Sequence, residues 1–414
     1  MKKGLFVAAL LTVSCFATAQ VKTVKEAKSL ADSKKFDQAE KLINQALTDE
    51  TMKKEASTWN VAGYIQKKIS EEENTKGYLK QPFDTTKMYN SIYKMFEYFT
   101  ECDKLEQIPD AKGKVKFKYR KANGESMKMD RPNLINGGVL FFNQGNDADA
   151  YKFFAMYLNS ANSPLLEKEN YAVTDTLAPD IAYYASLAAI RMAQSSKDNA
   201  EAEKANYQKV LQFTPIAAKS KDNGKAALEF QAAAYKALGD TVNWMNTLKE
   251  GIEKYPDYAY FSGNLIDYYS NSGKYDEALQ FTEQMIQKGG ETPFMLYVLG
   301  YLYQNKKDYD KAIDAYKRTI EKDPAYAEAY SNLGLCYCQQ GLDYGSKATT
   351  DLNDPKYKED QAKIKAYYES ARPYYEKARD LKPDNKELWM NGLYTIYYNL
   401  GMEAEFKEIE KLME

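Results

Sequence analysis

The feature that most constrains this chain is a 34-residue period in its C-terminal half. Segments that predict pairs of helices begin at Lys225, Ala259, Pro293 and Ala327, so each start lies 34 residues after the one before it. A unit of this length is a helical hairpin that cannot bury its apolar face alone and must stack on its neighbours. We therefore expect an array of stacked helix pairs.

The copy that begins at Pro293 shows the spacing most completely. Positions 4, 7, 8, 11, 20, 24 and 32 of this unit hold Leu296, Leu299, Gly300, Tyr303, Ala312, Tyr316 and Pro324. The large residues of the first half share one face of a helix, while Gly300 and Ala312 are small enough for two antiparallel helices to approach closely. Pro324 ends the second helix because proline cannot continue it.

This spacing resembles the tetratricopeptide repeat (TPR), whose pattern is W-x2-L-G-x2-Y, then A-x3-F, then P. The Ala327 copy repeats the first half of the pattern, and its second half follows an insertion at about 339–363. The matching residues are Tyr330, Leu333, Gly334, Tyr337, Ala371, Tyr375, Ala378 and Pro383. In two other copies Ile266 replaces the position-8 Gly and Trp244 replaces the position-20 Ala, so we expect those copies to pack less regularly.

Looser copies extend the pattern towards the N-terminus. The copy that begins at Arg131 stays in register, whereas the segments around Ala39, around Trp59 and at 181–213 are degenerate. A last helical pair begins at Trp389. The resemblance implies an all-α fold, a right-handed superhelical TPR solenoid of antiparallel helix pairs with a degenerate N-terminal helical region.

One segment outside the repeats alternates basic with aromatic or aliphatic residues. It contains Lys112, Lys114, Val115, Lys116, Phe117, Lys118, Tyr119, Arg120 and Lys121. Alternation with a period of two is typical of an extended edge that meets an anionic surface, either lipid headgroups or an acidic partner. The alternative, which we favour, is an exposed linker. We place a boundary here, with an N-terminal helical region at 20–130 and the TPR solenoid at 131–414.

The first 19 residues have the pattern of a secretory signal peptide. Lys2 and Lys3 precede an apolar run at 5–16, and small residues at 17–19 form a cleavage site. The apolar run is too short for a comfortable membrane anchor, although lipidation at Cys15 is an alternative. We therefore predict an exported protein, periplasmic or envelope-associated, with no transmembrane segment after cleavage of 1–19.

The composition excludes several classes of function. With 57 basic and 59 acidic residues, the chain lacks the strong basic footprint of a nucleic-acid binder. It contains no histidine, which removes the commonest general base and the zinc sites that depend on it. Most carboxylates stand beside lysines at helical spacing, as Asp310 and Asp314 do beside Lys311 and Lys317, and predict a solvated face. We expect no catalysis, no cofactor and no metal.

Three cysteines remain after cleavage of the predicted signal peptide: Cys102, Cys336 and Cys338. Because residues two apart on a helix point about 200° away from each other, Cys336 and Cys338 do not predict a redox or metal site. We expect buried, small apolar side chains, although a bridge from Cys102 to one of the others stays open.

The resemblance also implies where a partner binds. In TPR proteins, positions 2, 5, 9 and 12 of the first helices face the concave groove. Carried onto this sequence, they indicate a partner-binding groove at Tyr260, Asp267, Phe294, Tyr297, Tyr301, Gln304, Glu328 and Ser331, together with Gly263, Ser270, Leu335 and Cys338. Tyrosines in a groove suit an extended peptide or a stacked sugar ring, although they also suit packing between repeats.

We therefore expect a non-enzymatic, exported TPR scaffold that binds a protein or peptide partner in the groove. The alternative is a glycan-binding envelope protein that uses the tyrosines of the same groove. A third possibility within the family, a clamp for a C-terminal carboxylate, is disfavoured because position 5 of the repeats holds no cation.

Overall fold

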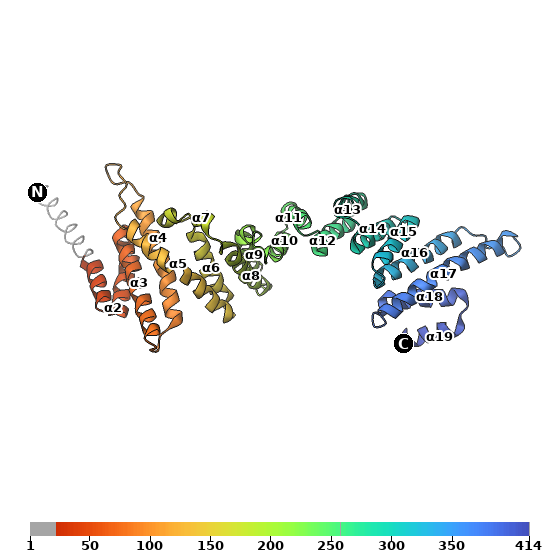
Figure 1. Ribbon diagram of the computed structural model, residues 1–414, viewed down its shortest axis with the longest axis horizontal. Helices are drawn as coiled ribbons and strands as arrows, with labels where there is room; N and C mark the ends of the chain where they lie inside the picture. Colours follow the sequence, from red (N-terminus) through yellow and green to blue (C-terminus); the bar gives the residue numbers. More distant parts are fainter. Residues whose placement is uncertain (1–21, 257, 414) are drawn as a thin grey trace, which may run out of the picture. The chain divides into compact units, whose positions relative to one another are not determined.

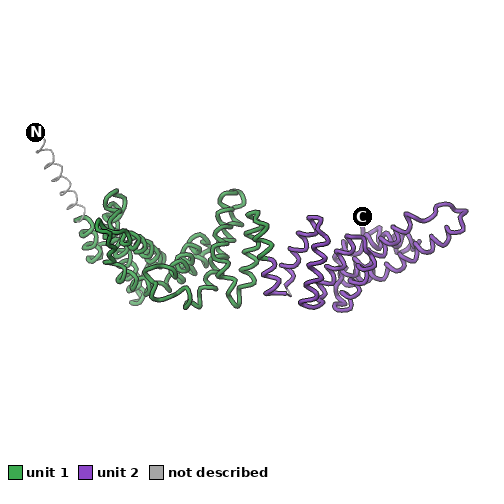
Figure 2. The backbone as a smooth tube through the Cα atoms, turned by 90° about the horizontal axis from the view of Figure 1, so that it is seen from above, with its two compact units in different colours: residues 1–247 green, residues 248–414 purple. Residues whose placement is uncertain are grey.

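A computed structural model describes residues 22–256 and 258–413 of the chain. This described part contains helices and no β-strand, which confirms the predicted all-α class. The chain divides into two compact units, coloured separately in Figure 2: unit 1 ends at Thr247 and unit 2 begins at Leu248. None of the described helices combines the length and apolar character needed to cross a bilayer. The predicted signal peptide at 1–19, with Cys15, lies outside the described residues.

Unit 1 is a succession of helices that begins with a helical stretch at 22–32. Its further helices are α2 (Phe36–Thr48), η1 (Met52–Lys54), α3 (Ala56–Tyr78), α4 (Thr85–Glu106), α5 (Arg120–Asn143), α6 (Asp147–Ser160), η2 (Pro164–Glu169), α7 (Tyr171–Thr174), α8 (Ala178–Gln194), α9 (Ala200–Ala217) and α10 (Gly224–Ala237). Side-chain caps fix several of the starts, as where the carboxylate of Asp84 accepts a hydrogen bond from the backbone of Lys87.

Unit 2 contains the most regular copies of the repeat. Helix α11 (Thr241–Lys254) spans the division between the units, and the helices after it are α12 (Ala259–Asn271), α13 (Tyr275–Gly289), α14 (Pro293–Asn305), α15 (Tyr309–Lys322), α16 (Ala327–Gly345), α17 (Lys356–Leu381), η3 (Lys386–Leu388), α18 (Met390–Leu400) and α19 (Glu403–Met413). Helices α12, α14 and α16 begin at the residues that the 34-residue period predicts.

In both units the paired helices pack mainly on their neighbours along the chain (Figure 1). Unit 1 contains the pairs α3–α4, α5–α6 and α8–α9, and unit 2 contains α12–α13, α14–α15, α16–α17 and α18–α19. Each pair also contacts its successor within the unit, for example α15 with α16 and α17 with α18. Stacking of neighbouring pairs is the contact pattern expected of a solenoid.

In several pairs the two helices meet where a glycine lies against an aromatic ring. A Cβ atom built on Gly300 of α14 would lie 2.6 Å from Cε1 of Tyr316 in α15, so only glycine fits there. The same arrangement pairs Gly63 with Phe99, Gly138 with Phe154 and Gly334 with Tyr375. Tyr316 is fully buried, and its hydroxyl donates a hydrogen bond to Gln304. The pattern of the sequence thus predicts a specific steric fit.

In the α12–α13 pair the large and the small residue of this contact have changed places between the two helices. Ile266 stands at position 8, where the α14–α15 and α16–α17 pairs have Gly300 and Gly334, and is buried. The residue 16 positions later, which corresponds to Tyr316 in the next copy, is Thr282. Thr282 is fully buried, and its hydroxyl donates to the carbonyl of Ala278. A large residue on the first helix is therefore matched by a small one on the second.

The predicted insertion at 339–363 mostly lengthens two helices. Helix α16 continues to Gly345 and α17 begins at Lys356, so only a short loop joins them (Figure 1). The carboxylate of Asp360 closes this loop. It accepts hydrogen bonds from the Tyr344 hydroxyl at 2.6 Å and from the Thr349 backbone at 2.9 Å. The insertion is thus an ordered extension of the hairpin.

The structure differs from the proposed boundary near residue 130, because α5 runs without a break through that position. The physical reason is the burial of Arg131 between the rings of Tyr157 and Tyr171, at 3.7 and 4.1 Å from their centroids. Its guanidinium donates to Asp175 at 2.7 Å, and both side chains are 5% exposed. Arg131 therefore belongs to the core of unit 1, and the compact units divide only at 247/248.

The glycine contact gives a first prediction. Replacing Gly300 by Ala forces the Tyr316 ring to move, so we expect a loss of about 1–3 kcal/mol in the free energy of unfolding. Chemical denaturation followed by circular dichroism measures this change. Gly289→Ala is the matched control, because its Cβ would meet nothing within 4 Å and its stability should equal or exceed that of the parent. Equal stability of both variants would contradict the proposed fit.

Candidate partner-binding face

The residues predicted to line a groove lie on α12, α14 and α16, the first helices of three successive pairs in unit 2. Helices α14 and α16 contact each other directly, although α15 lies between them in the sequence. This places the predicted residues of α14 and α16 on neighbouring helices. We call the side formed by these positions the first-helix face.

Tyr297 does not offer a free ring, because it packs between repeats. Its ring centroid lies 5.0 Å from that of Tyr326, in a stacked arrangement, and 5.8 Å from that of Tyr316. Asn332 of the next first helix donates a hydrogen bond to its hydroxyl at 3.1 Å. Burial raises the pKa of Tyr297, against the lowering effect of this hydrogen bond. Tyr297 therefore joins α14 to α16.

Two further predicted residues are held by internal hydrogen bonds. Gln304 accepts from the buried Tyr316 hydroxyl at 2.7 Å, which ties α14 to α15. Ser331 is buried and donates to the backbone carbonyl of Leu388, at the end of η3. These polar side chains support the packing of the pairs, so they are less available to a partner than the sequence suggests.

The surface that remains accessible is centred on Tyr301, which is 41% exposed. Asp267 on α12 is exposed, and Phe294 on α14 is partly buried close to Gly263. On α16, Glu328 forms an ion pair with Lys382 at 2.5 Å, and this partner holds the pKa of the Glu328 carboxyl below its usual value against the effect of burial. The face thus presents one aromatic ring among charged groups.

Tyr260 and the flanking positions add little free surface. The Tyr260 ring lies 5.3 Å from that of Phe261, edge to face, and 6.2 Å from that of Tyr258. Cys338 and Ser270 are buried, and the Ser270 hydroxyl has no hydrogen-bond partner. A sequence pattern identifies which helical face a residue occupies, but it does not show which rings are covered by the next repeat.

Pockets also lie away from the first-helix face. One in unit 1, of about 550 Å³, is lined by residues of α3, α4, α5 and α6, among them Trp59, Tyr98 and Met127. Another in unit 2, of about 750 Å³, lies between α11 and α13 and includes Ile252 and Phe281. Sequence reasoning missed the second because it assigned ligand contacts to first helices only.

The three cysteines of the described part are free and buried. Burial raises the pKa of Cys102, Cys336 and Cys338 to about 12 in each case, so their thiols stay protonated at neutral pH and are poor nucleophiles. The bridge from Cys102 left open by the sequence is not formed. Within residues 22–256 and 258–413, no three histidine, cysteine, aspartate or glutamate side chains come together in a way that could hold a metal.

Comparison with protein families supports the resemblance seen in the sequence. Residues 300–341, which extend from α14 through α15 into α16, match the model of the TPR repeat. The TPR resemblance is confirmed there. This stretch contains Tyr301, Gln304, Glu328 and Ser331 of the predicted face.

The curated relatives are distant. The Photosystem I assembly protein Ycf3 of Acaryochloris marina is 23% identical over 167 residues, which are 39% of this chain and 90% of that protein. The antiviral innate immune response effector IFIT1 of Homo sapiens is 22% identical over 223 residues, 52% of this chain but only 44% of IFIT1.

Solved structures with similarity include two TPR repeat proteins. The C-terminal part of a TPR repeat-containing protein from Cytophaga hutchinsonii aligns with a TM-score of 0.41 and 18% identity, over 66% of this chain and 92% of that one. A TPR repeats protein from Bacteroides fragilis aligns with a TM-score of 0.31 and 19% identity, over 68% and 99%. The fold assignment rests on the helix pairing described above and on the repeat match.

The contrast between two tyrosines of α14 gives a second prediction. Tyr297→Ala removes packing against Tyr316 and Tyr326 and should lower the free energy of unfolding by about 2–4 kcal/mol. Tyr301→Ala, at an exposed site, should change it by less than about 0.5 kcal/mol. Denaturant titration of both variants tests this expectation. If Tyr301→Ala were the more destabilising, our assignment of the accessible ring would be wrong.

Proposed function

We propose that this tetratricopeptide repeat protein is a non-enzymatic, exported scaffold that binds a protein or peptide partner on the first-helix face of unit 2, centred on Tyr301. The repeat family supports the general role, since TPR proteins bind protein partners. The relative Ycf3 is named for the assembly of a protein complex, which agrees with a scaffold.

The observation that carries the proposal is an exposed ring on a rigid support. Tyr301 is 41% exposed, whereas its neighbours one turn away on α14 are fixed, Tyr297 by Asn332 and Gln304 by Tyr316. A tyrosine presented on a preorganised surface offers a large contact area and loses little entropy on binding.

Charged groups around this ring favour a peptide over an apolar ligand. Asp267 on α12 is exposed, and the Glu328–Lys382 pair is partly exposed. An extended chain that crosses the three first helices meets a carboxylate, then an aromatic ring, then an ion pair. Such a mixture suits alternating apolar and charged side chains of a peptide, because each charge on the face can select its opposite.

Glycan binding on the same face is the alternative, and the ring contacts weigh against it. Stacking of sugars needs exposed ring faces, and a platform of several tyrosines was the reason to consider a glycan. The ring of Tyr297 is stacked on Tyr326, and that of Tyr260 contacts Phe261. Tyr301 is the accessible ring among the predicted tyrosines of α14.

Site-specific photo-crosslinking tests the proposed face. A photoreactive phenylalanine derivative at position 301 should crosslink a discrete protein partner in the native host. The same substitution at Tyr78, 88% exposed at the end of α3, is the control and should not. Tyr301→Ala should weaken binding of the recovered partner by about tenfold or more. Equal crosslinking at both positions, or retention of the protein on a polysaccharide column that Tyr301→Ala abolishes, would refute this function.

Export requires its own test. If residues 1–19 direct secretion, the protein recovered from its host should begin at Gln20 and lie outside the cytoplasmic fraction. Mass spectrometry of the intact protein distinguishes cleavage after Ala19 from modification at Cys15. Recovery of the uncleaved chain from the cytoplasm would contradict export while leaving the proposed binding face intact.

A further inference from the structure

The loop that joins α4 to α5, residues 107–119, is the most basic exposed segment of unit 1. It carries four lysines and one acid, Asp110, and Arg120 and Lys121 follow it at the start of α5. All of residues 107–118 are exposed. We call this segment the basic loop. The sequence left open whether it is a plain linker or a surface that meets anions.

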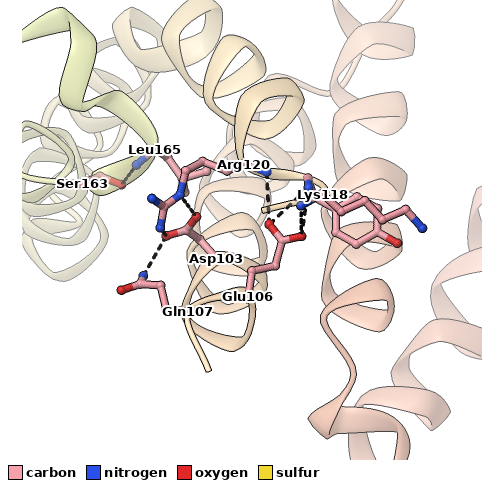
Figure 3. Close-up of polar contacts among 8 residues, drawn as sticks. Asp103, Glu106, Gln107, Lys118, Arg120, Ser163 and Leu165 are labelled. Carbon is pink, nitrogen blue, oxygen red and sulfur yellow. Dashed lines mark hydrogen bonds and ion pairs between the residues drawn. The ribbon is translucent and has the colours of Figure 1, made fainter. Parts of the chain in front are cut away.

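Buried carboxylates hold the base of the basic loop in one position (Figure 3). Glu106, at the end of α4, is 7% exposed and accepts hydrogen bonds from the backbone of Lys118 at 2.6 Å and of Tyr119 at 3.0 Å. It also accepts from the backbone of Arg120 at 3.2 Å. The carboxylate thus occupies the N-terminus of α5, where free backbone N–H groups attract negative charge.

A second carboxylate, one turn earlier on α4, positions an aromatic ring on the surface. Asp103 is 3% exposed and accepts from Arg120 at 2.6 and 2.9 Å, a two-pronged ion pair. The guanidinium of Arg120 in turn lies 3.5 Å from the centre of the Phe117 ring. Phe117 is nevertheless 46% exposed. The buried charge therefore fixes an apolar ring at the solvent boundary.

The tip of the loop is a tight turn in which the only acid of the loop, Asp110, accepts backbone hydrogen bonds. The Asp110 carboxylate accepts from the backbone of Lys112 at 2.9 Å and of Lys114 at 3.0 Å, and Gly113 adopts a positive φ of 73°. The Lys116 ammonium lies 3.4 Å from the same carboxylate but is 76% exposed. The lysines of the loop therefore face solvent with little neutralisation.

Apolar side chains are also exposed in this loop, two of them between its lysines. Ile108 is 63% exposed, Val115 43% and Phe117 46%. Exposure of several apolar residues does not stabilise a solvated linker. The hydrogen bonds at the base of the loop hold these residues at the surface. Cationic and apolar groups side by side match the boundary between lipid headgroups and acyl chains.

A pocket beside the loop also combines apolar residues with lysines. Its volume is about 550 Å³, and the root of the loop lines it together with the stretch at 22–32, η1 and α3. Val24, Met52 and Val61 form its apolar part. Its charged lining residues are Lys25, Lys28 and Lys118 and one acid, Glu55. An apolar pocket with lysines around it suits an anionic amphiphile such as a phospholipid.

We propose that the basic loop and this adjacent pocket dock the protein onto an anionic lipid surface. An acidic protein would satisfy the lysines but has no need of the exposed Ile108, Val115 and Phe117, whereas an anionic membrane accommodates both. Each lysine near a negatively charged bilayer adds to the attraction, and the apolar side chains enter the headgroup region. The docking surface lies in unit 1, and the proposed partner-binding face lies in unit 2. An experiment can therefore refute either proposal without affecting the other.

Vesicle co-sedimentation with the full chain lacking residues 1–19 tests the proposal. We expect binding to vesicles of mixed phosphatidylglycerol and phosphatidylcholine, weakened by added salt, and little binding to phosphatidylcholine alone. Replacing Lys112, Lys114 and Lys116 by Glu should weaken binding by at least about tenfold. The matched control carries the same changes at Lys197, Lys204 and Lys221, exposed lysines of unit 1 away from the loop, and should bind as the parent does.

A second variant separates insertion from charge attraction. Val115→Ser with Phe117→Ser keeps every lysine, so it should retain binding at low salt and lose several-fold more than the parent at high salt. Circular dichroism confirms that each variant is folded. Equal binding to neutral and anionic vesicles, or wild-type binding by the lysine variant of the loop, would overturn the proposal. So would binding to polyglutamate without binding to anionic vesicles, which indicates an acidic protein partner.

Discussion

The close approach of two helices at a glycine is the contact on which the rest of this structure depends. Gly300 lies against the ring of Tyr316, and Gly334 lies against that of Tyr375, although the insertion separates the second pair in sequence. A large ring on one helix fits only where the facing residue on the other helix is glycine, which has no side chain. Because the contact is steric, it fixes both the distance between helices and their register.

Where this contact sets a pair, the outer surface of that pair is free to differ. In unit 2 the first helices bury Tyr297 between repeats and leave Tyr301 accessible on the same helix, one turn away. The insertion extends α16 and α17 without disturbing the fit of Gly334 and Tyr375, because Asp360 closes the extension at its far end. A rigid scaffold with a variable surface is what recognition of a partner requires.

Unit 1 depends in addition on buried charges that lie outside the repeat pattern. Arg131 pairs with Asp175 between two tyrosine rings, and Asp103 pairs with Arg120 at the base of the basic loop. Removing one member of a buried pair leaves an uncompensated charge, so such pairs specify one arrangement of the segments that they join. They explain why irregular connections in unit 1 are ordered even where the 34-residue period is lost.

The period by itself determined the helical class, the starts of α12, α14 and α16, and the glycine and aromatic positions, because these follow from spacing along a helix. The resemblance to the TPR family, rather than the period, implied the helical face to which Tyr301 belongs. Only the tertiary structure decided that Tyr297, Gln304 and Ser331 form hydrogen bonds within the protein. It also decided that α5 is continuous through residue 130 and that two carboxylates of α4 hold the basic loop. Those outcomes depend on residues distant in sequence, whose mutual contacts no local spacing encodes.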